Sequence, residues 1–154
     1  MKEPQLSVII PTYNEKDNIE EILNRLEKTL KNISYEVIFV DDDSPDGTGN
    51  TVKRQRQSRP YVQLIQRVGR RGLAGAVIEG ILSSKSKTSA VMDCDLQHDE
   101  TKLIEMLSLF KKNPKKSNYL YFLTPQGIKE KTNLTLNFMK RKMREYDELK
   151  KEIE

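Results

Sequence analysis

The sequence predicts an α/β protein built around a mainly parallel β-sheet, and three observations lead to this class. Short apolar runs alternate four times with segments of helical period between residues 6 and 111. Each apolar run ends in a polar cluster, as strands do at the ligand-binding edge of a parallel sheet. At 154 residues, the chain suits one domain, or one domain with an appendage.

The first strand and helix have clear boundaries. Leu6–Ile10 is an apolar run closed by Pro11, which is typical of a buried strand. Asn18 is a suitable N-cap for a helix that extends to about Leu30. The apolar residues of this helix share one face: Ile19, Ile22, Leu23, Leu26 and Leu30.

Three further strand–helix pairs follow. The strands are expected at Tyr35–Val40, Val62–Gln66 and Ala90–Met92. The helices are expected over residues 49–58, over the segment that holds Ala76, Val77 and Ile81, and over Glu100–Lys111. In the last helix we expect four side chains to face inward: Leu103, Ile104, Leu107 and Phe110. The connections should be right-handed crossovers, with helices on both faces of the sheet.

The C-terminal part has a different character. We divide the chain into a domain over residues 1–112, a linker over 113–118 and a tail over 119–154. In the tail, Tyr119–Leu123 suits a short strand and Pro125 suits the first turn of a long helix. This helix has a coiled-coil-like apolar seam: Met139, Met143, Tyr146, Leu149 and Ile153. The seam indicates either association with another helix, including a second copy of the chain, or docking on the sheet.

Charge is unevenly distributed. The chain has a net charge of +4, to which residues 111–154 contribute +6 and residues 1–110 contribute −2. The basic character therefore belongs to the tail, and the body gives no signal for nucleic-acid binding. The single cysteine, Cys94, fits a reducing compartment. Without a signal-like start or a run of about 20 apolar residues, we expect a cytoplasmic protein, with the inner face of a membrane as an alternative location.

The polar clusters at the four strand ends should form one site, because the carboxyl ends of parallel strands lie at one edge of the sheet. The clusters are Thr12–Glu15, Asp41–Asp46, Arg67–Arg71 and Asp93–Gln97.

The last cluster contains a candidate metal site. Asp93 and Asp95 flank Cys94 directly after a buried strand, and two such carboxylates suit a hard divalent cation that bridges two phosphates. Gln97 adds a neutral oxygen ligand. Strand-end aspartates are also common without any function. For His98 we favour a position at the surface or at a helix cap over a catalytic role.

The other clusters suit a nucleotide. Asp41 and Asp42 repel each other and need a partner, such as base N–H groups, ribose hydroxyls or a cation. Glu15 is a further acceptor for base or ribose, and Tyr13 could stack on the base or simply pack in the protein. Asp43, Ser44 and Asp46 are expected to stabilise the turn itself.

The glycine-rich turn suits a phosphate. Arg67, Arg70 and Arg71 flank Gly69 and Gly72 just before a helix N-terminus. The alternative is an ordinary solvated basic turn.

Taken together, four segments resemble the dolichol-phosphate mannosyltransferase branch of glycosyltransferase family 2, in order and in spacing. The segments are Ser7–Glu15, Val40–Thr48, Gly69–Ala76 and Met92–Asp99. The Ser-Pro-Asp-Gly-Thr turn that begins at Ser44 is the more specific element, because the Asp-any-Asp triplet is shared widely.

The resemblance implies a GT-A, Rossmann-like fold and a set of site residues. The nucleotide-sugar would be lined by Pro11, Tyr13, Glu15, Val40, Asp42, Asp93, Cys94 and Asp95. Mg or Mn would be held by Asp95 and Gln97 with Asp93, and the two aspartates would be catalytic. The implied reaction transfers mannose or glucose, with inversion, from a donor of the GDP-mannose or UDP-glucose class to a polyprenyl phosphate.

The C-terminal part departs from that pattern. The acceptor-side strands and the arginine that such enzymes carry after the triplet have no counterpart beyond residue 110, so acceptor binding and activity are in doubt. Residues 119–154 resemble instead the end of an exopolysaccharide-associated MarR-type winged-helix regulator. The sequence thus leaves two further interpretations: a non-enzymatic interaction protein, and the remnant of a fused transcription regulator.

Overall fold

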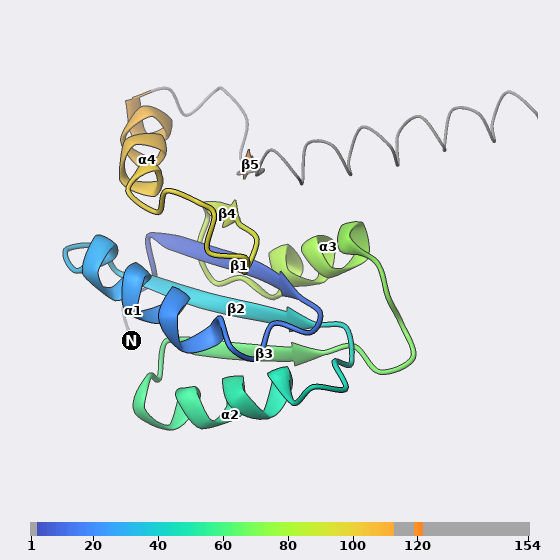
Figure 1. The fold of residues 1–154 in the computed structure, drawn as a ribbon. Coiled ribbons are helices and arrows are strands. Elements are labelled where there is room, and N and C mark those ends of the chain that lie inside the picture. Colours follow the sequence, from blue (N-terminus) through green and yellow to red (C-terminus); the bar gives the residue numbers. More distant parts are fainter. Residues whose placement is uncertain (1–2, 113–118, 122–154) are drawn as a thin grey trace, which may run out of the picture. The chain divides into compact units, whose positions relative to one another are not determined.

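A parallel sheet organises the part of the chain that the structure, a computed structural model, describes: residues 3–112 and 119–121. Its strands run in the order β3-β2-β1-β4-β5, and every adjacent pair is parallel (Figure 1). The strands are β1 (Leu6–Thr12), β2 (Tyr35–Asp41), β3 (Val62–Gln66), β4 (Ser89–Val91) and β5 (Tyr119–Tyr121). The predicted α/β class with a parallel sheet is confirmed.

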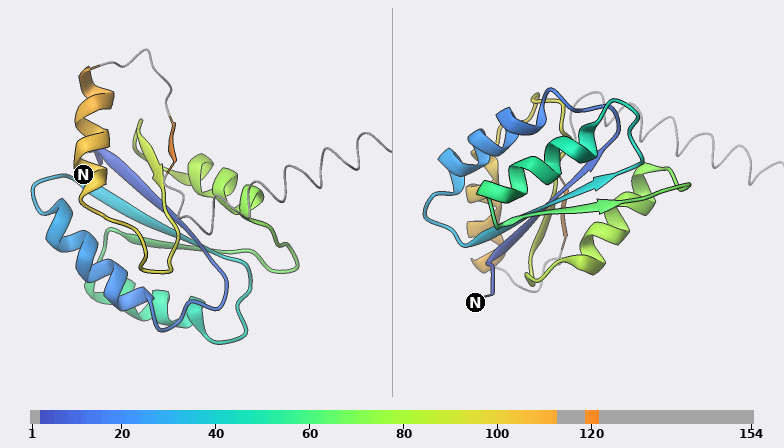
Figure 2. Two further views of the ribbon diagram at one scale, coloured as in Figure 1. Left: turned by 45° about the horizontal axis from the view of Figure 1, so that its top comes forward. Right: turned by 90° about the horizontal axis from the view of Figure 1, so that it is seen from below.

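Helices cover both faces of the sheet. The helices are α1 (Ile19–Leu30), α2 (Thr48–Ser58), α3 (Leu73–Ser83) and α4 (Lys102–Lys112). Helices α1 and α2 lie on one face and α3 lies on the other (Figure 2). Two apolar clusters result, because successive strand side chains point to opposite faces. Val8 and Phe39 pack on the α1 face, whereas Ile9 and Val40 pack on the α3 face.

The first helix begins differently from the prediction. Asn18 precedes α1 but makes no capping hydrogen bond with its side chain. Its side-chain amide donates instead to Glu15 Oε2 at 2.7 Å. Strand β1 also continues through Pro11 to Thr12, with Pro11 opposite Val40 of β2. Both differences lie at the ends of the loop that joins β1 to α1.

Two predictions near the fourth helix need correction. Helix α4 starts at Lys102 rather than at Glu100. Ile104 is 44% exposed, although its spacing predicted an inward position, while Leu103 and Leu107 are buried. The helix therefore buries a narrower stripe than the sequence suggested.

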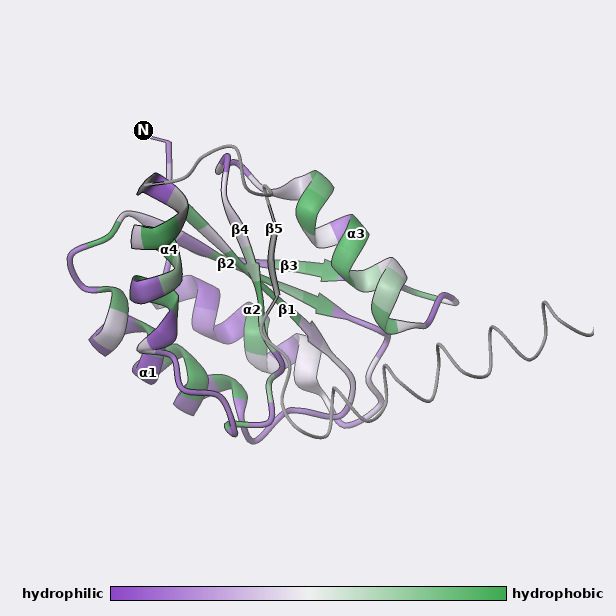
Figure 3. Ribbon diagram, turned by 90° about the horizontal axis from the view of Figure 1, so that it is seen from above, coloured by the Kyte–Doolittle hydropathy of each residue, from purple (hydrophilic) through white to green (hydrophobic). Residues whose placement is uncertain are grey.

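Helix α3 is the most apolar helix that the structure describes. In Figure 3 much of the length of α3 is coloured green, for hydrophobic residues. Ala76 and Gly80 face the sheet, yet Leu73, Ile78 and Leu82 remain exposed. Exposure of single apolar residues is common in soluble proteins.

The predictions for the tail lie largely outside the described residues. The short strand is observed as β5, which pairs with β4. The linker at 113–118, the long helix with its apolar seam and the inward side chain of Phe110 lie outside what the structure describes. Among the described helices, none combines the length and the apolar character that crossing a membrane requires.

Candidate functional site

The carboxyl ends of the first four strands meet at one edge of the sheet, as their parallel pairing requires (Figure 1). Backbone hydrogen bonds extend this pairing beyond the strands. The Asp42 N–H donates to the Thr12 carbonyl at 3.0 Å, and the Arg67 N–H donates to the Asp41 carbonyl at 2.8 Å. On the other side, the Met92 N–H donates to the Ile9 carbonyl at 3.1 Å. The four predicted clusters therefore belong to one region.

The β1–α1 loop is fastened to the turn that follows β2. The backbone N–H groups of Asn14 and Glu15 donate to the hydroxyl oxygens of Ser44, at 3.0 Å, and Thr48, at 2.9 Å. Asp46 then accepts from the backbone N–H and the hydroxyl of Thr48, at 2.9 and 2.6 Å. Ser44 and Asp46 thus do the turn-stabilising work that the sequence predicted, and they also hold the neighbouring loop.

The paired acids after β2 already have partners within the protein. Asp41 accepts from the Ser44 N–H and hydroxyl. Asp42 accepts from Arg67 Nη1 at 2.6 Å and from the Gly72 N–H at 2.7 Å. Asp42 is buried, and these bonds engage both of its carboxylate oxygens. Its predicted contact with a nucleotide has to coexist with this ion pair.

The three arginines of the glycine-rich turn have different surroundings. Arg67 is buried and pairs with Asp42 and Glu79, so its charge is already balanced within the protein. Arg70 is 60% exposed and pairs with Glu79 at 2.8 Å. The Arg71 guanidinium lies 4.8 Å from the centroid of the Tyr13 ring. Arg70 and Arg71 remain accessible to a phosphate.

Glycine is required in this turn. Gly69 and Gly72 have φ values of +69° and +121°, where side chains other than glycine are strained. The turn therefore brings the Gly72 N–H to Asp42 at the start of α3.

Three carboxylates gather around the β4 end of the site. Burial raises the pKa of Glu15, and the nearby charges of Asp95, Asp46 and Asp93 raise it further, against a lowering by the Asn18 hydrogen bond. Burial also raises the pKa of the Cys94 thiol, with added contributions from Glu15, Asp95 and Asp93. Neighbouring carboxylates repel one another, and a bound cation relieves that repulsion.

The Asp95 turn is tightly folded. Its carboxylate accepts from the Gln97 N–H at 3.1 Å, and Leu96 between them has a φ of +60°. His98 Nδ1 lies 3.7 Å from Asp95 Oδ1. The favoured surface position of His98 is wrong, because its side chain is only 2% exposed. His98 is therefore buried and does not face solvent.

Other residues implied by the resemblance take varied positions. Tyr13 is 43% exposed, so its ring is open to a ligand. Pro11 is partly buried. The side chains of Val40 and Cys94 are enclosed in the apolar core, so these two residues offer only backbone groups to a ligand.

Glu15, Asp93 and Asp95 suit a divalent cation, because Mg and Mn prefer negatively charged oxygen ligands. No three His, Cys, Asp or Glu side chains within 3–112 and 119–121 converge as a ready-made metal site. The protein thus offers a few carboxylates, which is how Mg²⁺ is commonly bound alongside substrate phosphates.

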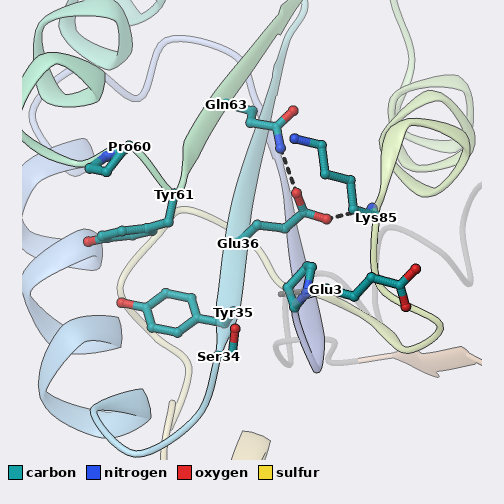
Figure 4. A pocket seen from close by; sticks show the side chains of 9 residues that line it. Glu3, Ser34, Tyr35, Glu36, Pro60, Tyr61, Gln63 and Lys85 are labelled. Carbon is teal, nitrogen blue, oxygen red and sulfur yellow. Dashed lines mark hydrogen bonds between the residues drawn. The ribbon is translucent and has the colours of Figure 1, made fainter. Parts of the chain in front are cut away.

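A separate cavity of about 700 Å³ opens at the amino ends of β2 and β3 (Figure 4). Glu36, one of the two glutamates that line it, is buried and accepts hydrogen bonds from Ser7, Gln63 and the Lys85 N–H. These bonds satisfy Glu36. The convergent polar groups of this fold therefore lie at the opposite edge, beside Glu15 and Asp95.

The sequence matches the glycosyl transferase family 2 profile over residues 7–153. The chain belongs to this family. The match also extends beyond the boundary at 112, so family membership rests on more than the motif-bearing body. The resemblance of the tail, residues 119–154, to a winged-helix regulator is not shown, because the family 2 match includes nearly all of these residues.

Individual relatives agree with the family. A dolichol-phosphate mannosyltransferase of Pyrococcus furiosus is 45% identical over 107 residues, which are 67% of this chain and 30% of that protein. A dolichyl-phosphate β-glucosyltransferase of Mus musculus is 39% identical over 100 residues, 59% of this chain and 31% of that protein. This chain therefore spans about a third of the length of these curated relatives.

A solved structure shares the fold. The mannosyltransferase PcManGT of Pyrobaculum calidifontis, in complex with GDP-Man and Mn²⁺, superposes with a TM-score of 0.61 at 28% identity. The match covers 71% of this chain and 33% of that one. The GT-A assignment is thereby confirmed for the described α/β unit.

Sequence reasoning missed the pairing of Arg67 with Asp42. A signal was available: Asp42 directly follows β2 and Arg67 directly follows β3, and adjacent parallel strands bring such ends together. What the sequence lacked was the strand order that makes β2 and β3 neighbours.

Proposed function

We propose that this chain binds a nucleotide diphosphate sugar, of the GDP-mannose or UDP-glucose class, as the donor half of a transferase that acts on polyprenyl phosphate. One observation carries the proposal: Glu15, Asp42, Asp93 and Asp95 follow the carboxyl ends of strands that lie side by side in the parallel sheet of a family 2 domain. The glycine-rich turn, which carries Arg70 and Arg71, lies at the same edge of the sheet.

Different residues of the site suit different parts of the donor. Tyr13 is half-exposed, and Arg71 stacks on its ring, so a base could lie beside this pair. Arg70 and Arg71 offer positive charge to the diphosphate. Asp95 with Gln97, and Asp93, would hold Mg or Mn. When bound, such a cation neutralises charge that develops on the departing diphosphate.

The protein's own contribution is placement. The acceptor oxygen of a polyprenyl phosphate is already anionic, so this reaction has little need of a strong general base. Binding and orientation of the donor then supply much of the acceleration. The β1–α1 loop holds Glu15 in place through Thr48 and Asn18, which directs its carboxylate to the same edge as Asp95.

We propose a cytoplasmic location. Nucleotide sugars are used in the cytosol, and Cys94 is a free, buried thiol, which fits a reducing compartment. A lipid-linked acceptor would place the protein at the inner face of a membrane.

Calorimetry tests donor binding. The full chain is titrated with GDP, GDP-mannose, UDP and UDP-glucose, with and without Mn²⁺. We expect one nucleotide series to bind, with an affinity that Mn²⁺ increases. Asp95→Ala should remove most of this Mn²⁺-dependent gain.

Asp99→Ala is the matched control, because Asp99 is exposed on the same loop and bonds only Thr101 among the contacts we describe. It should leave the Mn²⁺ effect unchanged. Equal binding by wild type and Asp95→Ala in Mn²⁺ would refute the metal assignment, and absence of binding by any of the four ligands would refute the donor site.

A further inference from the structure

Arg25 links helix α1 to the loop that carries Asp95 and Gln97. Its Nη1 donates to the carbonyl oxygen of Leu96 at 3.2 Å, across 71 positions of sequence. The same guanidinium lies 3.6 Å from Glu100 Oε1. Its Nε donates to Glu21 Oε1, one helical turn earlier, at 2.8 Å. One side chain thus contacts the middle and the end of the β4–α4 loop.

The carbonyl that Arg25 binds belongs to the residue with the least favourable backbone of that loop. Leu96 has a φ of +60°, a conformation that costs free energy for a residue other than glycine. Such a residue keeps its conformation only where its surroundings impose it. The turn bond from the Gln97 N–H to Asp95 supplies one restraint, and Arg25 supplies the other.

Glu100 strengthens this restraint. Its side chain is 11% exposed, and its Oε1 makes no hydrogen bond, so the Arg25 guanidinium is its ion-pair partner among the described residues. A buried carboxylate without a counter-charge is costly. Arg25 is therefore held toward the loop by Glu100, in addition to its own bond with Leu96.

Helix α1 also reaches the opposite side of the candidate site. Asn18, directly before the helix, donates to Glu15. The first turn of α1 thus leads to Glu15, and its middle, at Arg25, leads to the Asp95 turn. Helix α1 is thus connected to Glu15 through Asn18 and to the Asp95 turn through Arg25.

We propose that Arg25 is a positioning residue for the metal ligands: through Leu96 and Glu100 it holds Asp95 and Gln97 in the geometry that accepts the divalent cation. This inference rests on the proposed function of the site. Arg25 itself contacts neither donor nor cation, so its effect belongs to the metal-dependent part of binding.

The test compares the full chain with Arg25→Met, which keeps the aliphatic stem and removes the guanidinium. Glu21→Gln is the matched control, because it weakens the exposed ion pair of Arg25 and leaves the bond to Leu96. Arg25→Lys tests rescue, since it restores the charge near Glu100 without the planar fork of donors.

Two readouts are used. Amide hydrogen exchange of the metal-free protein follows residues 96–100 separately from α1 and the strands. Paramagnetic resonance of free Mn²⁺, with calorimetry of the nucleotide that binds wild type, follows the metal-dependent step. In Arg25→Met we expect exchange of the loop to rise about tenfold, equivalent to about 1.4 kcal/mol, and Mn²⁺-supported affinity to fall by a similar factor. Metal-free nucleotide affinity should be unchanged, Glu21→Gln should resemble wild type, and Arg25→Lys should be intermediate.

Three results would overturn the proposal. These are unchanged exchange of the loop in Arg25→Met, a uniform rise in exchange over the strands and α1, and an equal loss of nucleotide affinity with and without Mn²⁺. The last two would make Arg25 a general stabilising residue. If wild type binds neither Mn²⁺ nor nucleotide, the proposed function fails, and the exchange measurement still decides whether Arg25 orders the loop.

Discussion

At the scale of single residues, the buried ion pair of Asp42 and Arg67 joins two strand ends. Their side chains are 11% and 5% exposed, and the donor–acceptor distance is 2.6 Å. Arg67 also donates to Glu79 and to the Gly72 carbonyl, so its guanidinium joins three groups of the protein. A pair of this kind costs desolvation when it forms, but losing one partner is worse, because a charge stays buried alone.

We therefore expect Arg67→Met to lower the free energy of unfolding by about 3 kcal/mol or more, as breaking a buried pair does. The double variant Asp42→Asn with Arg67→Met should recover part of this loss, since no buried charge is then left unpaired. Urea denaturation measures both. Arg70→Met, at a position 60% exposed, serves as control and should cost about 1 kcal/mol at most. The pairing would be contradicted if the double variant lost more free energy of unfolding than the sum of the losses in the two single variants.

At the scale of secondary-structure elements, α3 approaches the sheet closely at Gly80. A Cβ atom built there lies 2.4 Å from Ile9 Cγ2 and 3.2 Å from Val40 Cγ2. Both neighbours are fully buried strand residues and have little room to shift. The absence of a side chain at Gly80 thus determines how near α3 lies to β1 and β2, and so where the glycine-rich turn stands.

Gly80→Ala should destabilise the protein by about 1–3 kcal/mol through overpacking. This sign is informative, because alanine in a helix interior would otherwise stabilise it by about 1 kcal/mol. Thermal and urea unfolding give the value. Leu82→Ala, at a side chain 80% exposed on the same helix, should change stability little. A Gly80→Ala variant as stable as wild type would mean that α3 moves away from the sheet without cost.

A second contact between elements links α1 to the segment before β3. Glu27 on α1 accepts from Arg59 Nε at 2.9 Å and from the Tyr61 hydroxyl at 2.6 Å. These two bonds, that of Arg59 first, lower the pKa of Glu27 in the folded protein. A carboxyl with a lowered folded pKa stabilises the fold above its unfolded pKa, and this contribution disappears as the pH falls through the folded pKa.

We expect Glu27→Gln to be less stable than wild type at pH 7, by about 1 kcal/mol at most because the Glu27 side chain is 42% exposed. The difference should shrink as the pH is lowered from about 5, because protonation then removes the same charge from wild type. Urea unfolding of both proteins between pH 3 and 7 checks this. A difference that grows toward acid pH would reverse the assigned direction of the pKa.

At the scale of the whole molecule, the described residues form the parallel-sheet part of a family 2 fold. The chain spans about a third of the length of its curated relatives, and the strand ends that carry the candidate site lie within that third. The proposed donor binding and the proposed sugar transfer should therefore be measured separately.

We expect the 154-residue chain to bind donor and to lack appreciable transfer, because it spans only about a third of the length of its curated relatives. Radiolabelled sugar transfer to a polyprenyl phosphate measures this. Turnover at rates usual for enzymes, roughly 1 per second or more, would contradict the expectation. It would mean that the tail, or a second subunit, completes the site.

Much of the fold follows from the sequence alone. Strands with both faces buried appear as short apolar runs such as Tyr35–Val40, and their alternation with amphipathic helices specifies a parallel α/β sheet. Since parallel strands end at one edge, Glu15, Asp42, Arg71 and Asp95 could be assigned to a single region before their positions were known. The family resemblance rested on these same motifs, and the profile match confirms it.

Only the tertiary structure decided which of those groups pair with one another. Arg67 and Asp42 are 25 positions apart, and Arg25 and Leu96 are 71 apart, so no local periodicity relates them. Burial of His98 and exposure of Ile104 likewise depend on which surfaces the neighbouring elements cover. Periodicity in a sequence reports the face of one element, whereas pairing and burial depend on strand order and on the approach of distant side chains.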